Sequence, residues 1–171
     1  MTLQQDIQNA LTIALPELQV ARFAVVIDGE SSPLRAGFRE CHGLGGTLSP
    51  FTINEPGDDK QRNFPQRVIY KPVTLVKGLD VDGFLYRWWK EAKEWEPGRA
   101  DYHRTVTIYS LQEIAAHVAI ARRGWDLFGA YVSEWSGPEH NAMSSDLAFE
   151  RVTIEYEEME EAPLGAFIGI G

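Results

Sequence analysis

Alternation of apolar and polar side chains with a period of two is the feature that most constrains the fold of this chain. It is clearest over Arg22–Asp28, where Phe23, Val25 and Ile27 share one face. A period of two is that of a β-strand, because successive side chains of a strand point to opposite faces. Turn-forming residues follow, and a second strand is predicted over Gly37–Leu44.

Further strand-like runs occupy most of the remaining chain. They cover Gln66–Leu79, Arg104–Ser110, Ile114–Arg122, Gly124–Trp135 and Asp146–Glu158. Short connections between them, such as Leu111–Glu113, predict hairpins. Pro72 lacks a backbone N–H and therefore favours an edge or a bulge for the strand that contains it. We expect a mainly β fold, either a sandwich or a barrel.

Two helices are also predicted. The first is short and N-terminal, with apolar residues at helical spacing that end at Pro16. The second covers about residues 82–94, and Asp80 or Asp82 is its expected N-cap. Its apolar face consists of Phe84, Leu85, Trp88, Trp89 and Ala92. On its polar face the predicted i,i+4 ion pairs are Arg87 with Glu91 and Lys90 with Glu94.

Length and charge restrict the class of protein. The 171 residues are enough for one domain with a substantial core. A net charge of −9 argues against a nucleic-acid-binding surface and against docking on anionic lipid. The first nineteen residues contain no Lys or Arg, which a secretory signal needs, and no apolar run is long enough to span a bilayer. We expect a protein made in the cytoplasm without a membrane anchor.

The sequence contains no constellation typical of catalysis. Its four histidines are never spaced like metal ligands: His42, His103, His117 and His140. Cys41 is the single cysteine, and we expect it to be a small buried residue. We therefore predict no metal, no cofactor and no enzymatic activity.

The tryptophans allow two interpretations. Trp88 and Trp89 have the helical spacing of core residues, and Trp95 and Trp135 are candidates for subunit contacts. The alternative is a ligand-stacking pocket formed by Trp88, Trp89, Trp95 and Trp125, which would make the protein a small-molecule-binding β-barrel.

Residues 51–65 differ from the rest of the chain. The segment is polar, contains two prolines and a glycine after position 53, and shows no periodicity. Such long loops are uncommon in compact domains unless they have a function. We expect a long exposed loop or a projecting hairpin.

The last predicted strand has one apolar and one polar face. Val152, Ile154 and Tyr156 are expected in the core, and Glu155 and Glu157 on the wet face. An acidic run of this kind usually marks a solvated surface.

Several motifs in order resemble the tube proteins of contractile phage tails, extracellular contractile injection systems and the type VI secretion tube. They are Ile27–Gly29, the Gly-Phe-x-Glu-x-x-Gly-Leu strand at Gly37–Leu44, the Thr-Leu-x-Lys-Gly strand at Thr74–Leu79, the Trp-containing helix at Phe84–Trp89 and the strand at Arg104–Ile108. The resemblance covers about Arg22–Glu158 and divides the chain into an N-terminal extension (1–20), a tail-tube β domain (21–159) and a C-terminal tail (160–171).

The resemblance implies a structural protein that forms stacked hexameric rings around a channel for DNA or effector proteins. The implied partners are further copies of the chain, a contractile sheath protein and baseplate or spike proteins, in a virion tail or an injection particle. The loop is then expected to contact a neighbour or the next ring through Asn54, Glu55, Asp58, Asp59 and Arg62. Glu155 and Glu157 become candidate channel-facing residues. A specialised tube-initiator or baseplate ring of the same fold is the alternative.

Overall fold

The structure, a computed structural model, describes residues 23–28, 38–54, 60–78, 83–99, 101–115, 118–138 and 148–163. The predicted N-terminal helix and most of the C-terminal tail lie outside these residues. The strands are β1 (Phe23–Ile27), β2 (Phe38–His42), β3 (Gly46–Ile53), β4 (Arg62–Tyr70), β5 (Val73–Gly78), β6 (Arg104–Ala115), β7 (Val118–Ser136), β8 (Phe149–Glu155) and β9 (Glu158–Glu161), and the helix is α2 (Phe84–Lys93).

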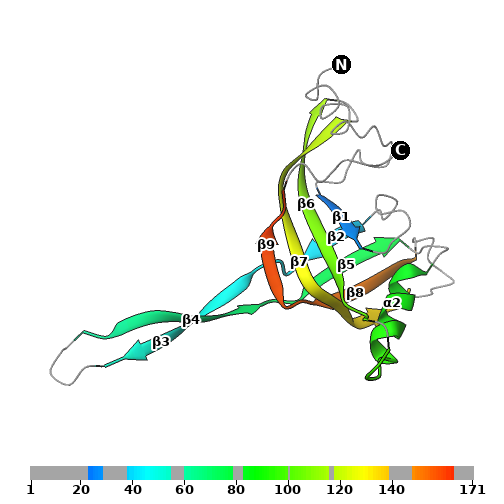
Figure 1. The fold of residues 1–171 in the computed structure, drawn as a ribbon. Coiled ribbons are helices and arrows are strands. Elements are labelled where there is room, and N and C mark those ends of the chain that lie inside the picture. The colour runs from blue at the N-terminus through cyan, green and yellow to red at the C-terminus, as the bar shows by residue number, and fades with distance from the viewer. Residues whose placement is uncertain are drawn as a thin grey trace, which may run out of the picture.

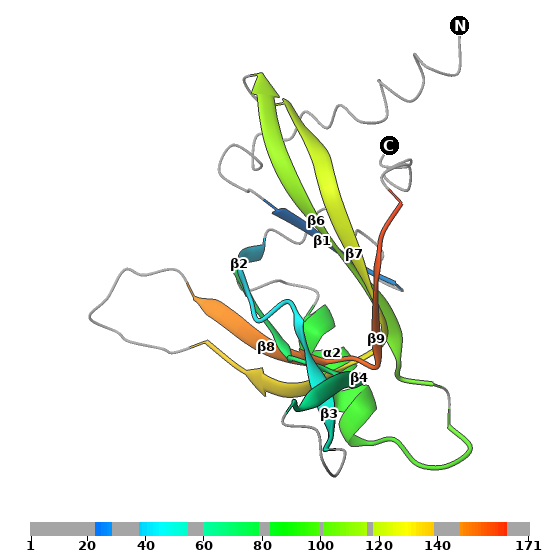
Figure 2. The same ribbon diagram turned by 90° about the vertical axis from the view of Figure 1, so that its left-hand side faces the viewer.

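Seven strands form one antiparallel sheet in the order β1-β6-β7-β8-β5-β2, with β9 paired to β7. The long strand β7 belongs to both halves of this sheet. Up to Ala130 it pairs with β6, and from Tyr131 onward it pairs with β8. The two halves therefore cross and face each other as a sandwich (Figures 1 and 2). Of the two expected forms the sandwich is correct, because β1 and β2 end the sheet without pairing to each other.

Gly129 lies at the junction of the two halves of β7. Its φ of 62° is in the left-handed region, and an added Cβ would lie 2.9 Å from the Glu157 side chain. Only glycine adopts this conformation readily and leaves that room. The strand therefore changes sheet partner at a residue that tolerates the bend.

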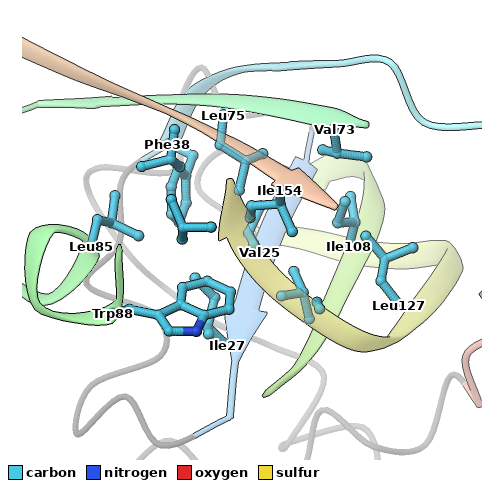
Figure 3. Packing of buried hydrophobic residues seen from close by; sticks show 14 of the residues in the cluster. Val25, Ile27, Phe38, Val73, Leu75, Leu85, Trp88, Ile108, Leu127 and Ile154 are labelled. Carbon is cyan, nitrogen blue, oxygen red and sulfur yellow. The ribbon is translucent and has the colours of Figure 1, made fainter. Parts of the chain in front are cut away.

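The core lies between the two halves of the sheet. Alternate residues of β1, β6 and β7 meet those of β5 and β8, and helix α2 covers one side (Figure 3). Its fully buried side chains are Val25, Ile27, Val73, Leu75, Leu85, Trp88, Val106, Leu127, Val132, Val152 and Ile154. The period of two and the apolar face of the last strand were therefore predicted correctly.

Helix α2 has the predicted location, but its start differs from the prediction. The N-cap is Gly83 in the left-handed conformation, with no side-chain cap, so neither Asp80 nor Asp82 is the N-cap residue. Phe84, Leu85 and Trp88 are buried, and the indole N–H of Trp88 donates to the carbonyl of Tyr102 at 2.9 Å.

Several predicted strand boundaries were wrong. The segment Leu111–Glu113, predicted as a hairpin connection, is part of β6, which pairs with β7 as far as Ala115. The predicted strand Gln66–Leu79 is two strands, because the chain leaves β4 at Lys71 and Pro72 and joins β5. The last predicted strand is divided into β8 and β9 at Tyr156 and Glu157.

Candidate functional site: the projecting hairpin and the sheet edges

Strands β3 and β4 form a two-stranded ribbon that extends away from the sandwich (Figure 1). The described part of 51–65, residues 51–54 and 60–65, thus lies in or next to the two strands of a projecting hairpin, one of the two forms expected from the sequence. Six large apolar side chains of this ribbon are 40–55% exposed: Leu48, Phe51, Ile53, Phe64, Val68 and Ile69. Only Tyr86 and Trp95 are similarly exposed elsewhere in the described part of the chain.

The exposed apolar side chains occupy both faces of the ribbon. Leu48 lies opposite Val68, and Phe51 lies opposite Phe64. Opposite residues of an antiparallel pair share a face, and adjacent residues alternate, so odd- and even-numbered positions of β3 lie on different faces. One face therefore carries Leu48 and Val68, and the other carries Phe51, Phe64 and Ile53.

The base of the hairpin is fixed to the sandwich. The carbonyl of Gly45 accepts hydrogen bonds from the backbone N–H of Lys71 at 2.9 Å and from the hydroxyl of Tyr156 at 3.2 Å. The ring of Tyr70 packs on that of Tyr156, with centroids 5.3 Å apart. Burial raises the pKa of Tyr156, so its hydroxyl keeps the proton that it donates. These contacts give the ribbon a defined direction.

The connection between β2 and β3 depends on Gly43. Its φ is 91°, and an added Cβ would lie 2.2 Å from the carbonyl oxygen of Pro72. The chain of β2 and the chain entering β5 can approach this closely only without a side chain at position 43.

The polar contact residues expected in this region are only partly within the described residues. Asn54 is exposed directly after β3, and Arg62 is exposed at the start of β4, opposite Ile53. Glu55, Asp58 and Asp59 lie outside the described residues. Between the strands, the Thr52 hydroxyl donates to the Asn63 side-chain oxygen at 2.9 Å. The structure does not test the predicted contact role of these residues.

Sequence reasoning missed the apolar residues of the ribbon. The sequence does carry a signal, because Leu48, Phe51 and Ile53 precede the polar segment and Phe64, Val68 and Ile69 follow it. No simple alternation is visible because of a register shift near Pro50 and because the ribbon is apolar on both faces.

The candidate channel residues do not lie on one continuous strand. Glu155 is the last residue of β8, opposite Tyr131, and is partly buried. Glu157 follows in a bend and is exposed; its backbone N–H donates to the carbonyl of Phe128 at 3.0 Å. The prediction that Glu155 and Glu157 share the face of one strand was therefore wrong, and their relation to a channel stays a prediction.

The described part of the sheet ends at strands with unpaired edges. β1 pairs only with β6, and β2 pairs only with β5. Unpaired backbone N–H and C=O groups of this kind can accept a strand from another chain. β9 likewise pairs only with β7, so the described part of the sheet offers three edges for association, in addition to the hairpin.

The tryptophans do not converge on a pocket. Trp88 is fully buried, as the helical spacing predicted. Trp89 packs with Tyr86 and Trp135, at centroid distances of 5.8 and 6.1 Å. Trp95 contacts Tyr102, away from that cluster. Trp88, Trp89 and Trp95 therefore do not line one common pocket, as the alternative of a small-molecule-binding barrel requires.

The described residues include no helix of the length and apolarity needed to cross a membrane. Within the same residues, no three His, Cys, Asp or Glu side chains are grouped as metal ligands would be.

An open β-sandwich with unpaired edges and an apolar projecting ribbon is typical of proteins that assemble with other chains. The family described as T4-like virus tail tube protein gp19 matches residues 19–160. The chain belongs to this family and is a structural subunit of a tube. No curated protein matches the chain in sequence.

Similar folds occur in solved structures of contractile systems. A chain of the anti-feeding prophage tube-terminating cap is 18% identical with a TM-score of 0.65, covering 84% of this chain and 89% of that chain. A chain of the extended sheath–tube complex of the PVC extracellular contractile injection system is 18% identical with a TM-score of 0.65, covering 95% and 98%. A type six secretion system protein is 14% identical with a TM-score of 0.53, covering 81% of each chain. At these identities the similarity concerns the fold.

Proposed function

We propose that this protein forms hexameric rings that stack into the inner tube of a contractile tail or injection particle. The observation that carries the proposal is the projecting hairpin, with large apolar side chains exposed on both faces. An isolated two-stranded ribbon is only marginally stable in water, and apolar surface of this kind is typical of interaction sites. If other copies of the chain covered the two faces, they would stabilise the ribbon and remove its apolar side chains from water.

The unpaired edges of the sheet supply the second element of the proposal. Head-to-tail pairing of identical edges around a closing rotation leaves no edge open. Each backbone hydrogen bond contributes only about 0.5–1.5 kcal/mol, so ring closure needs apolar burial as well. The exposed side chains of the hairpin provide it, either within a ring or between stacked rings.

The remaining partners follow from the same proposal. A contractile sheath protein would surround the tube, baseplate or spike proteins would terminate it, and DNA or effector proteins would pass through it. A hexamer carries six times the chain's net charge of −9, which disfavours adhesion of a polyanionic cargo to the wall. The role proposed is structural, without enzymatic activity, in a particle assembled from subunits made in the cytoplasm.

Electron microscopy of the purified protein by negative stain tests this proposal. We expect rings or tubes with a central channel at high protein concentration. A strictly monomeric protein at every concentration, with no tail-like particle containing it, would contradict the proposal. Caps at the ends of tubes rather than tubes themselves would favour the alternative of a specialised terminal ring.

A further inference from the structure

Beyond the hairpin and the sheet edges, the exposed side of α2 carries a groove. It has a volume of about 560 Å³ and is lined by Arg87, Lys90, Glu91, Glu94, Trp95 and Arg99. Arg87, Lys90 and Glu91 lie at helical spacing on one stripe of α2, and Glu94 is its C-cap. This stripe flanks the buried face formed by Phe84, Leu85 and Trp88. The chain after the helix returns Trp95 and Arg99 to the same side.

The anionic residues of the groove already have cationic partners. The Glu91 carboxylate accepts a hydrogen bond from Arg104 at 2.7 Å rather than from Arg87, the partner expected from sequence. The Glu94 carboxylate lies 3.8 Å from the Lys90 ammonium, as predicted; both side chains are about half exposed, so this weak pair leaves Lys90 able to contact a second carboxylate from outside. Arg104 is not among the lining residues, so it neutralises Glu91 without using a cation of the groove.

Two cations of the groove have no carboxylate partner within the described part of the chain. Arg99 donates to the main-chain carbonyl of Glu94 at 2.8 Å, a neutral acceptor. The Arg87 side chain forms no hydrogen bond or ion pair with another described residue, and it is exposed. The groove therefore has an excess of positive charge on a chain whose net charge is −9. Guanidinium groups in this setting favour a carboxylate ligand, which they can bind in a bidentate manner.

Trp95 gives the groove an apolar wall. Its side chain is 44% exposed, and its ring contacts that of Tyr102 edge-on at 5.6 Å, which fixes its orientation. Cations beside an exposed aromatic ring fit a ligand that carries acidic and apolar groups together. An acidic segment of a protein has this chemistry.

Strand β9 of the same chain has the complementary character. Glu158 and Glu160 are two residues apart in the strand and exposed, and their carboxylates form no ion pair with another described residue. Residues at this spacing share a face of a strand and lie about 6.7 Å apart. Arg87 and Lys90, at i,i+3 on α2, lie roughly 5–6 Å apart between their Cβ atoms. The two carboxylates of β9 and the two cations of α2 therefore have similar spacings, and their long side chains can form two ion pairs.

The position of the two surfaces excludes a contact within one chain. Figure 1 shows β9 on one side of the sandwich and α2 on the opposite side. Two different patches on opposite sides give a head-to-tail contact, which uses each patch once per copy and propagates from copy to copy.

We propose that the α2 groove of one copy receives strand β9 of a second copy, with Arg87 and Lys90 facing Glu158 and Glu160. This inference rests on the proposed self-assembly and assigns the residues of one of its contacts. The charge-assisted pairs would select the register of the two copies, and Trp95 would supply the apolar burial.

A reciprocal charge swap in the full-length protein tests the assignment. The groove variant is Arg87→Glu with Lys90→Glu, and the strand variant is Glu158→Lys with Glu160→Lys. We expect each variant alone to raise the protein concentration needed for assembly by at least about tenfold, because like charges then face each other. The variant that combines all four changes should assemble near the wild-type concentration.

Two controls keep the test specific. Lys93→Glu with Arg151→Glu changes the charge by the same amount at exposed positions outside the groove, the hairpin and the edge strands, and it should assemble like the wild type. Thermal melting of every variant checks that it folds. If a reversal variant melts early, the neutral pair Arg87→Gln with Lys90→Gln replaces it, with a smaller expected loss of assembly.

The outcomes separate this inference from the proposed function. If the wild type and both reversal variants need the same protein concentration to assemble, the inference is overturned and the tube proposal stays intact. Loss of assembly in the groove variant that the combined swap does not restore would also overturn it, because the occupant is then another surface or protein. A wild-type chain that never assembles would overturn both.

Discussion

Gly43 shows how one residue determines the geometry that the proposed assembly needs. Its left-handed φ of 91° and the 2.2 Å approach of an added Cβ to the Pro72 carbonyl leave no room for a side chain. The obstacle is backbone rather than a flexible side chain, so local relaxation cannot remove it. The direction of the hairpin therefore requires glycine at position 43.

Gly43→Ala is expected to destabilise the fold by about 2 kcal/mol or more, from backbone strain together with the clash. Gly78→Ala is the matched control, because a Cβ at position 78 meets no atom within 4 Å. Urea unfolding of the two variants measures the difference. Equal stabilities would contradict the structural role assigned to Gly43.

Cys41 gives a second prediction at the residue scale. The side chain is partly buried against the core, and burial raises the pKa of its thiol to about 11. The thiolate, which is the reactive form, is therefore scarce at neutral pH. We expect slow reaction with a thiol reagent in the folded protein and fast reaction after denaturation. Equally fast labelling in both states would contradict the assigned environment.

At the scale of elements, the sequence predicted those whose side chains face one core. The alternation in β1 and β8 and the helical spacing of Trp88 each result from one buried face, and both were predicted correctly. The period is visible because burial imposes it on the sequence. Boundaries within long ladders were not predictable, since β6 and β7 continue to pair through Leu111–Glu113 without a change in composition.

The candidate site was less predictable than the fold for a physical reason. The hairpin has no buried face in the single chain, so its apolar residues follow no one-sided alternation. The polar residues Asn54 and Arg62 were selected from composition, whereas the exposed apolar side chains occur along the ribbon. A surface that another molecule buries on both faces shows no alternation of apolar and polar residues, so the sequence of the single chain does not reveal it.

The apolar ribbon gives the prediction that belongs to this scale. Phe51→Ser with Phe64→Ser should leave the fold of the subunit intact but prevent assembly, because each buried Phe contributes roughly 1.5–3 kcal/mol per copy. Sedimentation and electron microscopy measure assembly, and circular dichroism measures the fold.

The matched control for the ribbon is Thr52→Ala with Asn63→Ala. These neighbouring residues form a polar pair across the strands, with the hydroxyl 2.9 Å from the Asn63 oxygen. We expect the control to assemble. Deletion of residues 54–63 extends the test, and it should give a folded protein that no longer polymerises. Normal tubes from the deletion variant would contradict a contact role for the hairpin.

At the scale of the whole molecule, the fold separates a closed core from surfaces that remain open. The sandwich buries its own apolar residues, whereas the hairpin, the outer edges of β1 and β2 and the α2 groove remain open in the single chain, and we propose that further copies cover them. Membership of the tail tube family and this distribution of surfaces agree with each other. We therefore expect stability of the subunit and assembly of the tube to depend on different residues.

The acidic residues after β8 give a prediction at this scale. If Glu155 and Glu157 face the channel, Glu155→Lys with Glu157→Lys should preserve ring assembly, because residues facing a water-filled channel do not contact another subunit. Electron microscopy of the variant provides the readout. Loss of rings, with an unchanged melting temperature, would place these carboxylates at a subunit contact instead.

A cryo-EM map of the assembled particle tests the central claim most directly. We predict that both faces of the hairpin are covered by neighbouring copies, with Leu48 and Val68 against one surface and Phe51 and Phe64 against another. A particle in which either face of the ribbon remains in solvent would contradict the account.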